Sequence, residues 1–181
     1  MKIAISGSSG KTGYRIAEEA IKKRHEITLL LRKNSELPEN LSNYKRKVVD
    51  LGNKVQLDQA LEGIDCLIIA TGARPSIDLT GPARVDAFGV KQQVDSCVRN
   101  DVKRIILVSS LCAGKWIHPL NLFGLILVWK RIGERALEQS GLAWTVIRPG
   151  GLTENEENIQ NQGILFSGPD KQQDAYIPRR L

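Results

Sequence analysis

The sequence predicts an α/β fold, with one doubly wound parallel sheet that carries helices on both faces. Short apolar runs alternate with segments of helical spacing along residues 1–151, the pattern of repeated strand–helix–strand units. The run at residues 27–31 is continuous rather than alternating, which is typical of a parallel strand buried on both faces. The length of 181 residues, 41% of them hydrophobic, suits one core better than two. We therefore expect residues 1–181 to form a single domain.

Six strands are expected, at residues 3–5, 27–31, 45–50, 65–70, 104–108 and 143–148. Apolar residues at helical spacing follow the first strand, and further helices are expected over 56–61, 82–100 and 120–139. Gly63 and Gly141 lie just beyond two of these helices, where a glycine commonly ends a helix. Residues 34–43 are rich in Asn, Ser and Pro and predict a loop.

The strand–helix pattern fades after Gly151. Residues 154–162 are polar and acidic, and residues 164–167 predict a short strand. The chain stops at residues 179–181, immediately after a loop-like Ile177 and Pro178, so we expect a further helix and strand to be missing from this sequence.

The charge balance favours anionic ligands. Lys and Arg total 26 against 20 Asp and Glu, a formal net charge of +6 that suits phosphate-bearing cofactors among others. The sequence has no long basic run and no interleaving of basic and aromatic residues, so nucleic acid is not an expected partner.

The cysteines and histidines indicate neither disulfides nor a metal site. The three cysteines, Cys66, Cys97 and Cys112, lie far apart without paired spacing. Cys66 opens an apolar strand and Cys97 lies within a helical pattern, which predicts buried free thiols, and the two histidines lack neighbours at ligand spacing. The longest apolar run, residues 122–129, falls far short of the ~20 residues of a membrane span. The N-terminus enters a strand without a signal or transit peptide, so we expect a soluble protein of the cytoplasm, or of the plastid stroma if a transit peptide was removed.

A glycine-rich loop joins the first strand to the first helix and is the most specific local signal. Gly7 permits a tight turn, Gly10 lets the backbone approach a ligand, and Gly13 lets the helix pack closely on its strand. The free amides of the first helical turn and the positive end of the helix dipole would then face a pyrophosphate. A flexible turn is the alternative, but the strand before and the helix after favour a nucleotide. The expected diphosphate-binding residues are Gly7, Ser8, Ser9, Gly10, Lys11, Thr12 and Gly13.

The carboxyl ends of the other strands complete a predicted cofactor pocket, because ligands of open parallel sheets bind at that edge. Asp50 can accept a hydrogen bond from the adenine amino group, and Leu51 can cover the ring. Arg148, at the end of the sixth strand, and the residues after it are expected near the nicotinamide. The remaining cofactor residues expected at strand ends are Ala70, Thr71, Gly72, Ser109, Pro149, Gly150 and Gly151.

Arg32 follows the second strand, where a dinucleotide-binding protein meets the adenosine ribose. An acidic residue there would favour NAD, whereas Arg32 favours the 2′-phosphate of NADP through a charge-assisted contact of roughly 1.5–3 kcal/mol. The neighbouring Lys33 is more simply interpreted as a solvated loop residue, and Lys11 can add positive charge. We therefore expect NADP(H) as the cofactor in preference to NAD(H).

The ordered motifs GSSGKTG, LLLRK, VDLGN, IIATGA, RIILVSS, VWKRIGERALEQSGL and TVIRPGGL resemble those of the atypical short-chain dehydrogenase/reductases. Within that family the sequence is most similar to the NAD(P)H-binding group of NmrA-like proteins and of the Tic-translocon-associated type. The resemblance runs from Lys2 to about Gly151. It implies a Rossmann-like sheet and NADP(H) binding.

Standard members of the superfamily reduce carbonyls with a Ser, a Tyr and a Lys, in which Tyr and Lys are spaced Tyr-x-x-x-Lys. Here Lys130 matches the Lys, but Ile126 stands at the Tyr position, and none of the tyrosines has a lysine four residues later. A positioned general acid contributes about 10²–10⁴-fold in rate, so a poor carbonyl reductase is expected. Lys130 can bind the ribose or lie at the surface, and Ser109 and Ser110 can bond near the nicotinamide or only end their strand. These three residues are the catalytic candidates.

Three functions stay open at this point. Hydride transfer to a flavin, a quinone or another conjugated acceptor needs alignment but no protein acid, and the family includes biliverdin/flavin reductases. Other members bind NADP(H) as sensors or assembly factors, which implies a protein partner. A sugar-nucleotide epimerase is disfavoured, because it depends on the same missing Tyr and on a larger C-terminal domain. The oligomeric state is not indicated by the sequence.

Overall fold

A six-stranded parallel sheet forms the centre of the molecule in the computed structural model, which describes residues 1–73, 78–155, 159, 163–164, 166–168 and 176–180. The strand order is β3-β2-β1-β4-β5-β6, so the order reverses beside β1, and the predicted Rossmann-like doubly wound fold is confirmed. The strands are β1 Lys2–Ser6, β2 Glu26–Leu31, β3 Arg46–Val48, β4 Cys66–Ile69, β5 Arg104–Val108 and β6 Ala143–Ile147.

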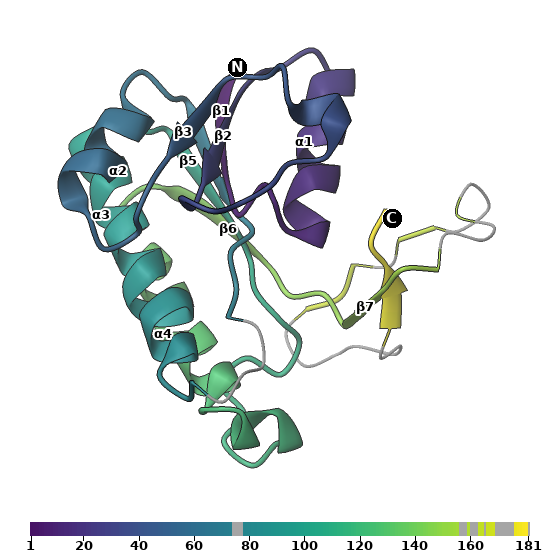
Figure 1. Cartoon of the computed structure of the whole chain (residues 1–181). Helices are drawn as coiled ribbons and strands as arrows, with labels where there is room; N and C mark the ends of the chain where they lie inside the picture. The colour runs from purple at the N-terminus through teal and green to yellow at the C-terminus, as the bar shows by residue number, and fades with distance from the viewer. Residues whose placement is uncertain (74–77, 156–158, 160–162, 165, 169–175, 181) are drawn as a thin grey trace.

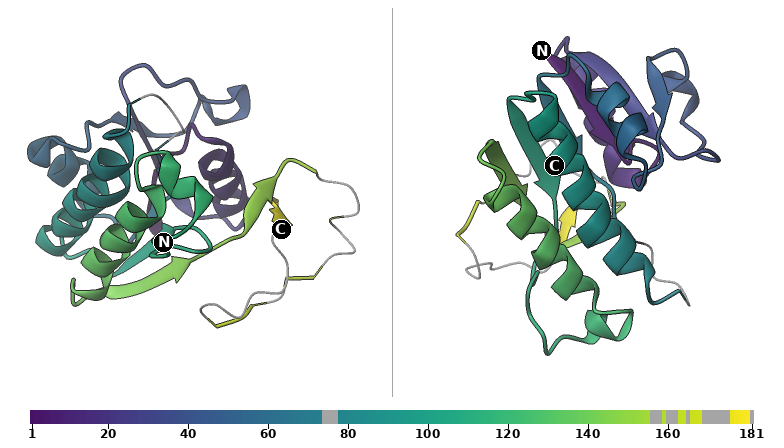
Figure 2. Two further views of the ribbon diagram at one scale, coloured as in Figure 1. Left: turned by 90° about the horizontal axis from the view of Figure 1, so that it is seen from below. Right: turned by 90° about the vertical axis from the view of Figure 1, so that its left-hand side faces the viewer.

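The helices form two layers around this sheet (Figure 1, Figure 2). Helix α1, Lys11–Lys22, covers one face, and α2, α3 and α4 cover the other. Their bounds are Lys54–Leu61, Val90–Arg99 and Ile126–Glu138, and a π-helical segment, η2 Ala83–Gly89, runs directly into α3. A short 3-10 turn, η1 Glu39–Leu41, lies within the predicted loop at 34–43.

Alternating strand residues divide the core into two clusters, one on each face. Ile3, Ile5 and Leu29 pack with Ala17 and Ala20 of α1. The strand residues that point to the opposite face pack against α2, α3 and α4. These strand residues are Ala4, Leu30, Leu67, Ile69, Ile105 and Leu107. Because the strands are buried on both sides, their sequences are continuous apolar runs rather than alternating ones.

The register of the sheet brings the strand ends to one edge. Ser6 pairs with Leu30 and with Ile69, and Val108 pairs with Ile147. The loops that carry the predicted site residues therefore leave the sheet at neighbouring positions. This common edge is the geometric basis of the candidate site.

The long helix predicted over residues 120–139 is confirmed only over α4, Ile126–Glu138, and its predicted start is wrong. A separate 3-10 turn, η3 Pro119–Leu122, precedes α4, and the chain between them takes positive φ at Gly124 (+76°) and Leu125 (57°). A Cβ at Gly124 would lie 2.4 Å from the Leu79 carbonyl oxygen, so the chain passes too closely for a side chain there. Asn121 fixes the break, because its side chain accepts from the Leu127 amide at 3.0 Å.

The end of the chain also differs from expectation. Strand β7, Gly151–Thr153, pairs in parallel with β8, Tyr176–Pro178, as a small separate sheet that the sequence did not indicate. Ile164, Phe166 and Ser167 are not in a strand, and Leu165 of the predicted strand at 164–167 lies outside the described residues. The expected further helix and strand stay a prediction.

Candidate functional site

The glycine loop has room for backbone only. Gly7 has φ +80°, and a Cβ there would lie 2.7 Å from the Ala70 carbonyl oxygen at the end of β4. A Cβ at Gly13 would lie 2.1 Å from the Gly7 carbonyl oxygen, whereas one at Gly10 would lie 3.2 Å from it. Gly7 is therefore required by a positive φ and a close approach, and Gly13 by the contact of α1 with the loop.

The start of α1 presents backbone donors to the edge of the sheet. Gly10 is the N-cap in an extended conformation, and no side chain caps the helix. The first-turn amides at Lys11, Thr12 and Gly13 are thus of the kind that bind phosphate oxygens, at the positive end of the helix dipole. The buried Ser8 hydroxyl donates to the Leu30 carbonyl at 3.2 Å and ties the loop to β2, while Ser9 is half-buried. This cradle fits the diphosphate of a dinucleotide.

Arg32, Asp50 and Leu51, the residues expected near the adenosine, lie at one half of this edge. Arg32 is exposed directly after β2 and makes no ion pair within the ranges that the structure describes. One Asp50 oxygen accepts from the Gly52 amide at 2.9 Å, so this oxygen stabilises the turn that follows Asp50. Leu51 packs against Gly89, because a Cβ at Gly89 would lie 3.2 Å from the Leu51 Cδ1.

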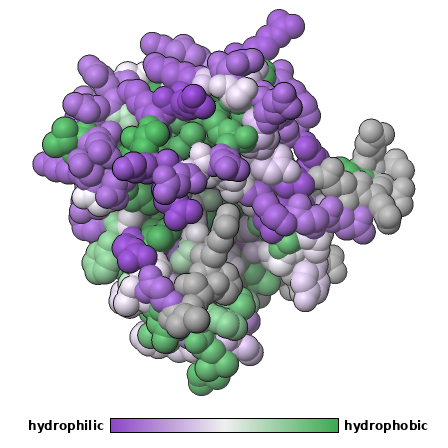
Figure 3. Space-filling view, viewed as in Figure 1, coloured by the Kyte–Doolittle hydropathy of each residue, from purple (hydrophilic) through white to green (hydrophobic). Residues whose placement is uncertain are grey.

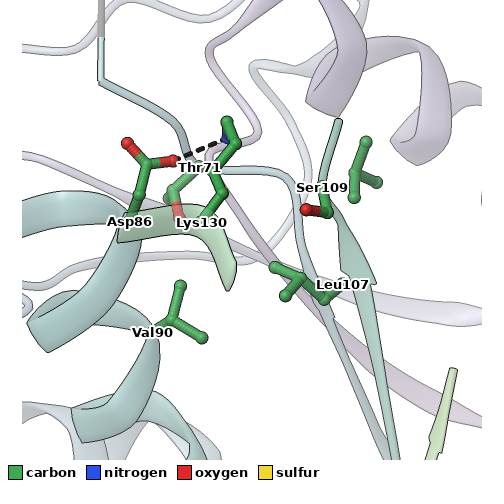
Figure 4. Close-up of a pocket in the computed structure, with 7 residues that line it drawn as sticks. Thr71, Asp86, Val90, Leu107, Ser109 and Lys130 are labelled. Atoms are coloured by element: carbon green, nitrogen blue, oxygen red, sulfur yellow. Dashed lines mark hydrogen bonds and ion pairs between the residues drawn. The ribbon is translucent and has the colours of Figure 1, made fainter. Parts of the chain in front are cut away.

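A small pocket at the other half of the edge brings together three predicted residues, Thr71, Ser109 and Lys130 (Figure 4). The Lys130 ammonium is largely buried and lies 2.7 Å from Oδ1 of Asp86, which is 2% exposed. A Cβ at Gly72 would lie 3.6 Å from the Lys130 ammonium, so the end of β4 passes directly beside it. Val90, Leu107 and Val108 supply the apolar part of the lining.

Asp86 is a site residue that the sequence analysis missed. Its second oxygen accepts from the Ala73 amide at 3.0 Å, so one buried carboxylate fixes both the loop after β4 and Lys130. It lies in the π-helical segment η2, and π-turns within helices are frequent at functional sites. Gly133 of α4 allows the approach of the two helices, because a Cβ there would lie 2.2 Å from the Asp86 carbonyl oxygen.

Polar atoms without partners lie in the same region. Among the described residues, the buried Thr71 hydroxyl has no hydrogen-bond partner. The Ser109 hydroxyl is buried without a hydrogen bond of normal geometry, yet it faces the Glu134 carboxylate closely enough to help lower the pKa of that group. Unpaired buried hydroxyls are costly, and bonds from a ligand would satisfy them. Ser110 is half-buried and does not line the pocket.

Arg148, expected beside the nicotinamide, binds Glu134. Its Nε and Nη2 donate to the two carboxylate oxygens at 2.9 and 2.6 Å. Burial raises the pKa of the fully buried Glu134, but the hydrogen bonds from Arg148 and Arg131 and the nearby Ser109 hydroxyl outweigh it, so the pKa lies below its ordinary value. Pro149 accepts from the Leu111 amide at 2.8 Å and joins the ends of β5 and β6, with Gly150 and Gly151 leading into β7.

Two further observations concern the described part of the chain. None of its helices combines the length and the apolar character needed to cross a bilayer. No group of three or more His, Cys, Asp or Glu side chains in it could hold a metal ion.

With this geometry established, the comparisons assign the class of protein. Residues 7–180 match the NAD(P)H-binding family, and the chain belongs to it. An uncharacterized chloroplastic protein of Arabidopsis thaliana is 33% identical over 83% of this chain and 59% of its own length. Protein TIC 62, chloroplastic, of Pisum sativum is 31% identical over 83% of this chain and 32% of its own. The chain thus spans between a third and three fifths of these relatives.

Sanguinarine reductase of Eschscholzia californica is 30% identical over 84% of this chain and 70% of its own length. Among solved structures, a putative NAD-dependent epimerase/dehydratase from Bacillus halodurans superposes with a TM-score of 0.87, at 24% identity over 99% of this chain and 83% of its own. The relatives support the atypical short-chain dehydrogenase/reductase resemblance, and the solved structure supports the fold.

Proposed function

We propose that this protein binds NADP(H) in preference to NAD(H) and passes hydride to a flexible range of conjugated acceptors, such as flavins or quinones. One observation carries the proposal. The pocket at the nicotinamide end holds Lys130 on a buried carboxylate, while Ile126 stands where a proton-donating Tyr would be needed. The similarity to a protein named sanguinarine reductase also supports a reductase.

The chain's own residues would bind and orient rather than exchange protons. When bound, the reduced nicotinamide supplies the hydride. The Lys130 ammonium can donate to ribose hydroxyls, and Asp86 holds it in place. The Thr71 and Ser109 hydroxyls offer hydrogen bonds to the polar edge of the nicotinamide. A conjugated acceptor stacked against the ring needs only this alignment, because proximity dominates such a transfer.

The acceptor side supports an apolar substrate. Hydrophobic side chains gather at the lower end of the view in Figure 3. The segment between β5 and α4, which leaves the same edge of the sheet, exposes Trp116 (70%), Ile117 (100%) and Leu122 (81%). Such a rim suits a planar aromatic molecule better than a sugar nucleotide, which carries many hydroxyl groups.

Cofactor preference in this proposal depends on Arg32. Its guanidinium is exposed beside the expected adenosine position, and within the described ranges no carboxylate neutralises it. A 2′-phosphate there would gain a charge-assisted contact, whereas NAD(H) offers no charge to it.

The test is oxidation of NADPH by the purified chain with flavin mononucleotide or a benzoquinone, followed by the loss of reduced-nicotinamide absorbance. Turnover is expected for the natural chain and a loss of about tenfold for Lys130→Met, the effect of one charge-assisted hydrogen bond. Lys91→Met, which removes an exposed lysine of α3, is the matched control. The double variant Asp86→Asn/Lys130→Met removes both charges of this pair, leaves neither one unpaired, and so separates an effect on catalysis from an effect on folding. If NADPH is oxidised with none of these acceptors, the proposed oxidoreductase activity is refuted.

A second candidate function is a non-catalytic, NADPH-sensing regulatory or assembly protein. The exposed apolar side chains beside the site also suit a protein partner. It predicts that partners captured from an extract differ with and without NADPH, and identical partners would contradict it. The two relatives labelled chloroplastic favour the plastid over the cytoplasm as the compartment of this proposal.

A further inference from the structure

A cluster of charged side chains fastens the end of the chain to the start of α1. Its centre is Glu154, the residue after β7. One carboxylate oxygen accepts from Arg179 Nε at 2.6 Å and lies 3.4 Å from the Lys11 ammonium, and the other accepts from Arg15 Nη2 at 3.0 Å. Three cations thus surround one carboxylate at the N-terminal end of the phosphate-binding helix.

Arg179 makes the connection continuous from the small sheet to the glycine loop. Its Nη1 donates to the Thr12 hydroxyl at 2.8 Å, and its Nη2 donates to the Leu152 carbonyl at 3.2 Å. Its own amide donates to the Thr153 carbonyl at 3.1 Å. Figure 1 and Figure 2 show β7 and β8 beside the N-terminal end of α1, in agreement with these contacts.

The positive electrostatic potential that attracts Glu154 would also attract a bound diphosphate. The N-terminal end of the helix dipole and the side chains of Lys11 and Arg15 are positive. They attract an internal carboxylate and a bound phosphate alike. The hydrogen bond from Arg179, with help from Lys11 and Arg15, keeps the pKa of Glu154 below its ordinary value, so this group is an anion at neutral pH. Two anions beside one helix start repel each other.

We propose that Glu154 is an affinity-determining residue, an internal counter-anion that the cofactor diphosphate displaces from Lys11 and Arg15. Displacement removes two of the three ion pairs of Glu154 and loosens the attachment of β7 and β8 to α1. The proposal rests on the dinucleotide binding stated above. It gives the end of the chain a structural response to cofactor binding.

The test is calorimetric titration of the full chain with NADPH. Glu154→Gln keeps the shape of the side chain and removes its charge, and it is expected to bind NADPH about two- to fivefold more tightly, the range of an exposed ion pair. Glu19→Gln is the control, because it removes one carboxylate from the far end of the same helix, where Glu19 pairs with Lys22. Glu154→Gln binding equal to the control, or weaker than the natural chain, would overturn the proposal.

Amide hydrogen exchange supplies a second readout that does not depend on the variant. Residues 151–154 of the natural chain are expected to exchange faster when NADPH is added, because Glu154 loses its two ion pairs with α1. Unchanged or slower exchange there would overturn the proposal while leaving cofactor binding intact. A natural chain that binds no NADPH would instead refute the proposed function, and the counter-anion with it.

Discussion

Gly13→Ala should damage the phosphate-binding loop by a predictable amount. The new Cβ would lie 2.1 Å from the Gly7 carbonyl oxygen, 2.7 Å from its carbon and 3.0 Å from the Ser8 Cα, all backbone atoms that cannot rotate away. A normal carbon–oxygen contact is about 3.3 Å, so α1 or the loop must move by about 1 Å. Overpacking of this kind costs about 1–3 kcal/mol, and the better helix propensity of Ala returns up to about 1 kcal/mol.

With the full propensity gain subtracted, the net loss is up to about 2 kcal/mol, which lowers Tm by up to about 8 °C for a chain of this size. Displaced loop amides should also raise the Kd for NADPH at least about tenfold, the equivalent of one hydrogen bond to a charged group. Thermal unfolding and calorimetric titration measure the two effects. Gly52→Ala is the matched control, because its Cβ would make an ordinary contact of 3.5 Å with Asp50 Oδ1. Unchanged Tm and Kd for Gly13→Ala would refute the packing argument.

Three further predictions address cofactor choice, acid stability and thiol reactivity. Arg32→Asp should raise the Kd for NADPH more than about tenfold and leave NADH nearly unchanged in parallel titrations; equal losses would show that Arg32 does not contact the 2′-phosphate. Because the pKa of Glu134 is lowered in the folded state, its stabilising effect is present above the ordinary value of 4.5 and is lost as pH falls through the folded pKa. Glu134→Gln should therefore lower the free energy of unfolding by about 1–3 kcal/mol near neutral pH, the cost of donors left without their charged acceptor. Its unfolding free energy should also depend less steeply on acid pH, and a curve parallel to that of the natural chain would count against the Arg148 pairing. Burial raises the pKa of Cys97 to about 12, so iodoacetamide at neutral pH should label Cys112 and spare Cys97 by mass spectrometry, whereas equal labelling would contradict its burial.

Local patterns were sufficient to predict the sheet and the glycine loop. A strand buried on both faces leaves a continuous apolar run, and a tight strand-to-helix turn needs glycine where φ is positive, as at Gly7. Both signals depend on residues close in sequence. The common edge of a parallel sheet then places the strand ends together without knowledge of any side-chain contact.

Features that depend on distant residues were not accessible from the sequence. Asp86 and Lys130 are 44 residues apart and meet because Gly133 lets α4 cross η2 closely. A single acid within an otherwise helical apolar pattern was the only signal for Asp86. The pairing of Arg148 with a fully buried glutamate on α4 likewise joins two segments and had no local signal.

The prediction of one continuous helix over residues 120–139 failed for a related reason. Helical spacing continues through residues 120–139, but Asn121 uses its side chain to hold the Lys115 and Trp116 carbonyls and the Leu127 amide. Side-chain bonds to the backbone compete with a helix in this way. The pairing of β7 with β8 likewise joins segments too short and too far apart for a local signal.

Calorimetric titration of the unmodified chain with NADPH, and then with NADH, tests dinucleotide binding at the β1–α1 loop most directly when Gly13→Ala is titrated beside it. We expect a saturable signal with NADPH, weaker binding of NADH, and a loss of affinity for both cofactors in the variant. No heat with either compound, or binding that Gly13→Ala leaves untouched, would contradict the site.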